Sequence, residues 1–130
     1  MSVFGGDASE VYKLGADLAA VGPKAVAPLR GVMEQAGEAL AHEWATNAVA
    51  TSGEHGKHYP SSIDSELVFG MTAIEVEVGP NSAKKQGSMG RGFEFGSVNQ
   101  PPHLDGLRAL DGFQGRAERI IDATVAHLLP

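Results

Sequence analysis

The histidines are the side chains of this 130-residue chain best suited to acid–base or metal chemistry. His42 and Glu43 begin as a zinc-protease helix does, but that motif needs a second histidine four residues after the first, and position 46 is Thr46. His55 and His58 could join His42 around a divalent metal, yet local spacing places no carboxylate or third ligand beside them. We therefore expect a solvated polar loop here, with no metal and no cofactor.

A cluster of glycines, Gly87, Gly90 and Gly92, resembles a loop that binds phosphate. Such a loop normally follows a buried strand and opens a helix whose N–H groups hold the anion. These glycines lead instead into residues 93–95, which we interpret as a short strand with both phenylalanine rings on one face. A serine-hydrolase elbow is also absent, because Ser88 lacks one of the two glycines that the motif requires.

The other candidates for acid–base work have simpler structural interpretations. Glu75 and Glu77 alternate along one predicted strand and fit the solvent face of a sheet. His103 follows two prolines, and a histidine that fixes a turn is the favoured interpretation. The chain has no cysteine, which excludes thiolate catalysis and disulfides. Enzymatic chemistry is therefore not predicted.

Composition limits the partners of the chain. Ten Lys and Arg against 16 Asp and Glu give a net charge of −6, which disfavours general attraction to nucleic acid or to an anionic membrane. No apolar run approaches the roughly 20 residues of a membrane-spanning helix. The first residues lack a secretory signal, so we expect synthesis in the cytosol and no membrane partner. The length suits one domain over residues 1–130.

Helical periodicity predicts the helices that flank these candidate residues. A first helix is expected after Asp7 or Ser9, ending at Gly22. The strongest pattern predicts a long helix over about residues 23–49, with Pro28 in its first turn. A short helical turn at 104–110 and a final helix on the apolar positions from Phe113 to Leu128 complete the helical part.

Alternation of apolar and acidic residues predicts the strands. Residues 63–69 and 74–78 form a hairpin with one apolar and one acidic face. Residues 81–92 are glycine-rich and basic, and we interpret them as a flexible loop. The predicted class is α+β: an antiparallel sheet of about three to four strands packed by a long helix in the N-terminal half and by a C-terminal helix.

Several short motifs, taken in order, resemble those of a known family. Phe93-Glu94-Phe95-Gly96-Ser97 precedes Pro101-Pro102-His103, and Leu107-Arg108-Ala109-Leu110 leads into the last helix. Upstream, the run from Gly56 to Ile63 follows a long helix rich in small residues, and Val78-Gly79-Pro80 closes a strand. Together these motifs resemble the neck or tail-completion proteins, the minor tail component family, of long-tailed phages.

The resemblance implies an architectural role without catalysis. Copies would form a ring, usually sixfold in this family, at the head–tail junction of a virion assembled in a bacterial cytoplasm. Neighbours would be the connector or stopper and the terminator or tail tube, and DNA would pass through the lumen without specific binding. The candidate interface residues are Lys84, Lys85, Arg91, Glu94, Pro101, Pro102, His103 and Leu104.

Three other functions stay open at this stage. A tail terminator would share the α+β design and the ring. A small ligand-binding or hydrolytic enzyme would use the glycine-rich loop and His103. A small homodimeric binding module would need neither.

Overall fold

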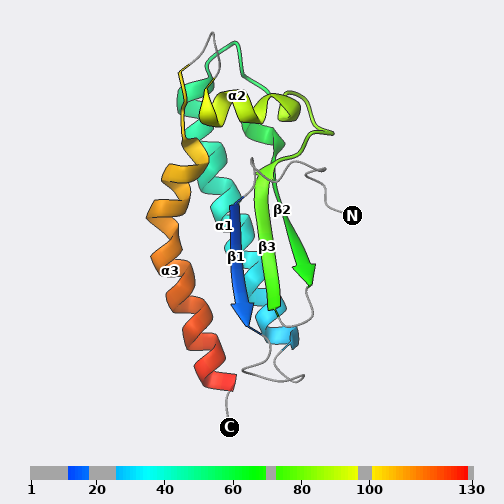
Figure 1. Ribbon diagram of the computed structural model, residues 1–130, viewed down its shortest axis with the longest axis vertical. Coiled ribbons are helices and arrows are strands. Elements are labelled where there is room, and N and C mark those ends of the chain that lie inside the picture. The colour runs from blue at the N-terminus through cyan, green and yellow to red at the C-terminus, as the bar shows by residue number, and fades with distance from the viewer. Residues whose placement is uncertain (1–11, 18–25, 70–72, 97–100, 129–130) are drawn as a thin grey trace.

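A computed structural model of the chain describes residues 12–17, 26–69, 73–96 and 101–128 (Figure 1). The elements are β1 (Tyr12–Asp17), α1 (Val26–Ser52), β2 (Ile63–Phe69), β3 (Ala73–Pro80), α2 (Gly90–Phe95) and α3 (Asp105–Leu128). Short 3₁₀ turns at Pro60–Ser62 and Gly87–Met89 precede β2 and α2. The α+β prediction is confirmed: a three-stranded antiparallel sheet packs against α1 and α3.

The last strand in the sequence lies at the centre of the sheet. The order is β1-β3-β2, and both neighbours run antiparallel to β3. Ile74, Val76 and Val78 are at most 1% exposed, because alternate β3 side chains point to the helices. Glu75 and Glu77 point to the other face, as the alternation predicted. The register places Glu66 of β2 opposite Glu77 on that same acidic face.

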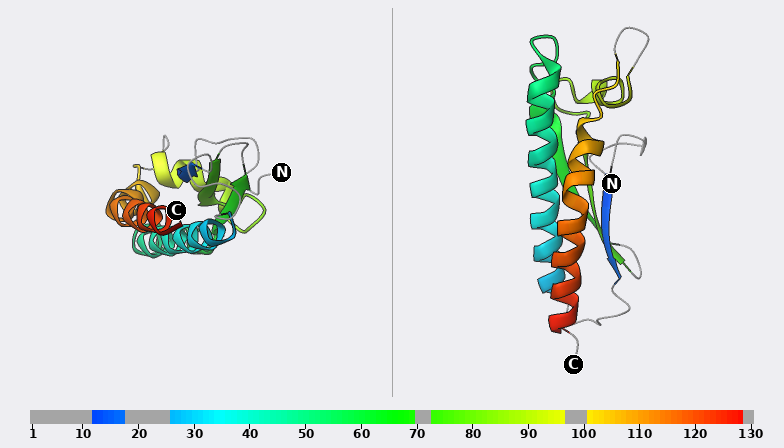
Figure 2. Two further views of the ribbon diagram at one scale, coloured as in Figure 1. Left: turned by 90° about the horizontal axis from the view of Figure 1, so that it is seen from below. Right: turned by 90° about the vertical axis from the view of Figure 1, so that its left-hand side faces the viewer.

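The two long helices lie side by side in a second layer behind the sheet (Figure 2). The predicted stripe of α1 is its buried face, and Pro28 lies in the first turn, where a missing N–H costs no helical hydrogen bond. The fully buried members of the stripe are Leu29, Met33, Leu40, Trp44 and Ala48.

Two glycines let backbone approach the core closely. A Cβ at Gly37 of α1 would lie 2.4 Å from a methyl carbon of Val76 in β3. A Cβ at Gly106 of α3 would lie 2.6 Å from the ring of Trp44. The helix–sheet spacing and the helix–helix spacing therefore each depend on one residue without a side chain.

The predicted N-terminal helix is wrong where the structure describes it. Residues 12–17 form strand β1, and the remainder of that prediction lies outside the described residues. The apolar positions fit both the helical repeat and the two-residue repeat of a strand. Leu14 belongs to a set spaced as in a helix, but Tyr12, Leu14 and Ala16 also occupy alternate positions, as in a strand. Their Cα partners are Val78, Val76 and Ile74 on β3, so pairing with the central strand decides in favour of the extended form.

Residues 93–95 are also not the predicted strand; they belong to helix α2. Because residues two apart in a helix point about 200° apart, the two rings separate. Phe93 is 2% exposed and Phe95 is 42% exposed. Part of the predicted loop at 81–92 is likewise regular, since it contains the 3₁₀ turn and the start of α2. The turn at 104–110 and the last helix are continuous in α3.

Replacing Gly37 by alanine should destabilise the fold by about 1–3 kcal/mol, because the new methyl group overlaps Val76. Gly31→Ala is the matched control on the same helix. Nothing lies within 4 Å of its Cβ position, so it should stabilise by about 0.5–1 kcal/mol through helix propensity. Urea unfolding measures both; equal effects of the two variants would contradict the packing described here.

Candidate interaction site at the start of α3

The segment before α3 runs back along α2 and is bound to it through the backbone. The His103 N–H donates to the carbonyl of Phe93 at 3.0 Å, and the Leu104 N–H donates to that of Glu94 at 3.0 Å. These carbonyls belong to the last turn of α2, where no intrahelical donor remains for them. Leu104 has a φ of 53°, a left-handed conformation that turns the chain into α3.

A buried carboxylate, that of Glu94, joins three elements. Glu94 is 1% exposed. One oxygen accepts from the Gly106 N–H at 2.9 Å; the other accepts from the Leu107 N–H at 2.9 Å and from the Tyr12 hydroxyl at 2.8 Å. The first N–H groups of a helix carry partial positive charge and have no partner within the helix. Glu94 of α2 therefore caps α3 and ties β1 to the same point.

A second buried carboxylate, Asp105, is the first residue of α3 and binds α1. It is fully buried, and both of its oxygens lie within 2.9 Å of the Thr51 hydroxyl. The Arg108 guanidinium donates to Oδ1 at 2.7 Å, and the Asn47 amide donates to the Asp105 carbonyl at 3.0 Å. The cation and the hydroxyl compensate this carboxylate for the loss of water. Nδ1 of His103 lies 3.8 Å from Oδ2 and makes no hydrogen bond.

Aromatic rings pack against one another beside the polar network. The rings of Tyr59 and Phe93 stack with centroids 4.5 Å apart, and the His103 ring tilts against Phe93 at 6.0 Å. Tyr12 packs on Trp44 at 5.4 Å. Burial, and then the hydrogen bond to Glu94, raise the pKa of the Tyr12 hydroxyl. Tyr12 therefore stays a protonated donor through neutral pH.

The basic turn after β3 is held to other parts of the chain. Lys84 pairs with Asp64 of β2 at 2.8 Å, and the Asn81 amide donates to the same carboxylate at 3.0 Å. The Gln86 side chain accepts from the His58 N–H at 2.7 Å and donates to the His55 carbonyl at 2.8 Å. Specific side-chain bonds thus fix this turn to β2 and to the segment after α1.

The predicted interface residues fall into two groups. Lys84 and Lys85 lie in the turn after β3, where Lys85 is exposed. The α2–α3 connection holds the others: Pro101 and Pro102 are exposed, and His103 and Leu104 are partly buried. Arg91 lies in α2, and its side chain is outside the described set. The buried side chain of Glu94 positions the connection and presents no surface of its own.

Five residues of the network were missed by sequence reasoning: Asp105, Arg108, Tyr12, Thr51 and Asn47. Asp105 and Arg108 stand at the i,i+3 spacing of a helix start, a local signal that could have identified them. Tyr12 and Thr51 carry no such signal, because their partners are 82 and 54 positions away.

The arrangement holds parts of the chain together. The oxygens of both buried carboxylates already accept hydrogen bonds from the protein. Within the described ranges, no three His, Asp or Glu side chains gather as metal ligands. No helix there is both long enough and apolar enough to cross a bilayer.

Comparison of the chain with family models, with curated proteins and with solved structures found no match.

Replacing Glu94 by glutamine should destabilise the fold by about 1–3 kcal/mol, because an amide N–H₂ then faces a backbone N–H in a buried position. Glu118→Gln on the exposed face of α3 is the control and should change stability by less than about 0.5 kcal/mol. Urea midpoints at constant m-value measure the difference. Equal stability of the two variants would contradict the capping role of Glu94.

The raised pKa of Tyr12 predicts alkaline sensitivity. The unfolded chain loses this phenolic proton near pH 10 while the folded chain retains it, so the contribution of Tyr12 is complete below pH 10 and declines above it. Tyr12→Phe should therefore lose less stability than the unmodified chain between pH 9 and pH 11. Parallel pH curves for the two proteins, from chemical unfolding, would refute this assignment.

Proposed function

We propose that this chain is a structural ring subunit of the neck or tail-completion type, at the head–tail junction of a long-tailed phage. The observation that carries the proposal is that the motifs behind the resemblance form one physical unit. Residues 93–94 and 103–104 are joined by backbone hydrogen bonds, and Glu94 caps the start of α3.

The described part of the connection between α2 and α3, residues 101–104, suits a contact surface that is ordered in advance. Pro101 and Pro102 are exposed, and their rings restrict the backbone before any partner binds. His103 and Leu104 anchor the same segment to α2. A segment that is ordered in advance loses little conformational entropy when it binds, which favours assembly.

The distribution of charged residues supports contacts between a basic surface of one subunit and an acidic surface of an identical neighbour. The exposed Lys85 lies beyond one end of β3, and the acidic face of the sheet carries Glu75 as well as Asp64 and Glu77, which pair with Lys84 and Lys13. A head-to-tail contact between the basic turn of one subunit and the acidic face of the next would form a ring where the rotation between subunits closes. The net charge of −6 also suits a lumen through which DNA slides without binding.

Reversing the charge of Lys85 should weaken ring assembly. Lys85→Glu is compared with Arg119→Glu, an exposed position on α3 that leaves the turn intact and changes the net charge equally. Native mass spectrometry and negative-stain microscopy measure the ring fraction. We expect rings for the unmodified chain and the α3 variant, and fewer rings for Lys85→Glu. A chain that forms no ring at any concentration and is absent from the junction in reconstructed particles would overturn the proposal.

The same reconstruction separates this function from that of a tail terminator. Density next to the connector fits a neck protein, and density capping the last tube ring fits a terminator. A nucleotide or metal that raises the melting temperature would instead favour the enzyme alternative.

A further inference from the structure

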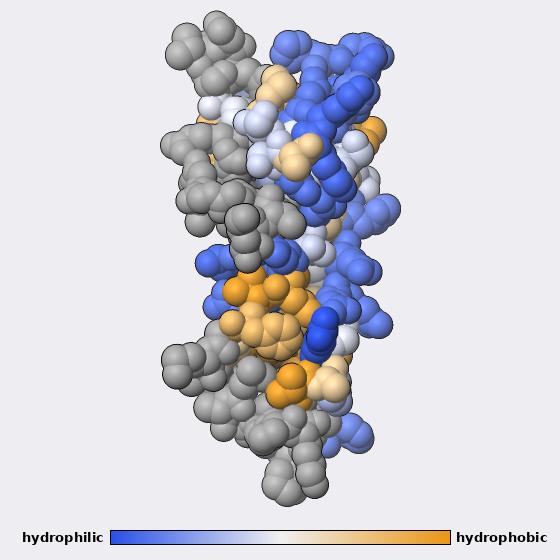
Figure 3. Space-filling model, turned by 90° about the vertical axis from the view of Figure 1, so that its right-hand side faces the viewer, coloured by the Kyte–Doolittle hydropathy of each residue, from blue (hydrophilic) through white to orange (hydrophobic). Residues whose placement is uncertain are grey.

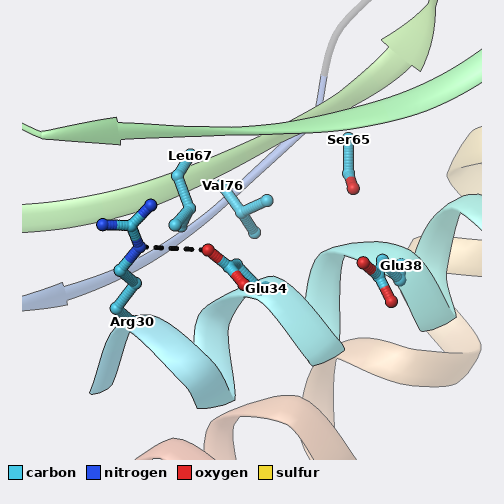
Figure 4. Close-up of a pocket in the computed structure, with 6 residues that line it drawn as sticks. All are labelled: Arg30, Glu34, Glu38, Ser65, Leu67 and Val76. Carbon is cyan, nitrogen blue, oxygen red and sulfur yellow. Dashed lines mark hydrogen bonds and ion pairs between the residues drawn. The ribbon is translucent and has the colours of Figure 1, made fainter. Parts of the chain in front are cut away.

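A groove runs along the outer edge of the sheet, between β2 and α1. Its first part has a volume of about 300 Å³ and is lined by Arg30, Glu34, Glu38, Ser65, Leu67 and Val76 (Figure 4). Its second part, of about 350 Å³, extends past Ala41, His42 and Ala45 to Pro60–Ser61. Glu38 and Ser65 line both parts, so the two form one continuous groove beside the strand.

Within the described part of the chain, the strand beside the groove has few of the features that usually protect a sheet edge. β2 has seven residues, contains no proline or lysine, and pairs only with β3 within the described part of the chain. Natural proteins normally shield such an edge with lysine, proline, a bulge or a covering segment. Apolar atoms gather on this side of the molecule, bordered by hydrophilic side chains (Figure 3). Phe69, at the end of β2, is 50% exposed.

We propose that this groove binds an extended segment of another protein, which adds to the sheet as a strand alongside β2. The bound backbone would pair with the free edge of β2, and alternate side chains would enter the groove towards α1. Leu67 and Val76 point from the sheet into the groove, where they provide an apolar floor (Figure 4). The inward side chains of the segment should therefore be apolar.

The charges around the groove indicate a cationic segment. Three carboxylates line it, but Glu34 pairs with Arg30 and Asp64 pairs with Lys84, which leaves Glu38 as the carboxylate available to a bound cation. Arg30 is occupied: it pairs with Glu34 at 3.1 Å and lies 5.8 Å from the centre of the Phe69 ring. Glu38 is exposed and has no ion-pair partner among the residues that the structure describes. Lysine or arginine alternating with apolar residues would match this rim.

The chain itself is a poor source for that segment. A second copy of β2 paired antiparallel about Ser65 would place Asp64 opposite Glu66, which is unfavourable for like charges. Residues 1–11 contain Asp7 and Glu10 and no lysine or arginine. The basic residues Lys84 and Lys85 belong to the turn that is already bonded to β2.

The test uses the full chain and a capped nonapeptide of alternating lysine and valine. We expect binding that protects the amides of Ile63–Phe69 from hydrogen exchange. A peptide of equal charge with two adjacent prolines at its centre cannot pair along either edge and should not protect them. An alternating glutamate–valine peptide should not bind.

Two variants of equal charge change locate the site. Glu38→Lys should weaken peptide binding about three- to tenfold, by removing one surface attraction and adding one repulsion. Asp122→Lys on α3 should bind as the unmodified chain does. Both positions are exposed, so folding should be unaffected.

Three results would overturn the inference: no binding at millimolar peptide, equal binding of the proline peptide, or β2 already protected by self-association. The ring assay with Lys85→Glu tests a different surface. Failure of the groove proposal can therefore be told apart from failure of the proposed ring function.

Discussion

The hydrogen bonds accepted by the buried carboxylate of Glu94 determine how α2, β1 and the start of α3 are placed, and the rest of the structure depends on that placement. It lies on a helix of six residues, which is too short to be stable alone. By accepting from Gly106, Leu107 and Tyr12, it fixes that helix to the start of α3 and to the edge strand β1. A buried charge is tolerated only with such partners, so the three elements must be placed together or not at all.

Asp105 extends the same constraint to α1. Because it is the residue before Gly106, the two carboxylates bind opposite sides of one helix start: Glu94 binds the backbone N–H groups, and Asp105 binds Thr51 and Arg108. Gly106 then allows α3 to approach Trp44 closely. The polar network and the helix contact reinforce each other here, since a larger residue at position 106 would displace the atoms that Glu94 caps.

The parts of the fold that were predicted from the sequence are those with long, unambiguous periods. The apolar stripe of α1 repeats over about six turns, and the alternation in β2 and β3 separates apolar from acidic residues at nearly every step. In β1 the pattern is only six residues long and fits both periods, and pairing with a distant strand decided between them. For Phe93–Phe95 the two-residue spacing suggested a strand, but docking of residues 103 and 104 on the carbonyls favoured a helix. The interface role of Glu94 was inferred from its motif, whereas its burial follows from partners that no local pattern reveals.

The sheet order has a consequence for how the chain folds. The central strand β3 is the last of the three to leave the ribosome, so neither β1 nor β2 has its partner until about residue 80 is free. Helix α1 can form from local contacts alone and is complete before that moment. Closing β1 onto β3 then requires bringing together segments separated by a whole helix and a strand. Of the two strand pairings, this one therefore has the larger loop-closure entropy, and we expect it to limit the rate at which the sheet forms.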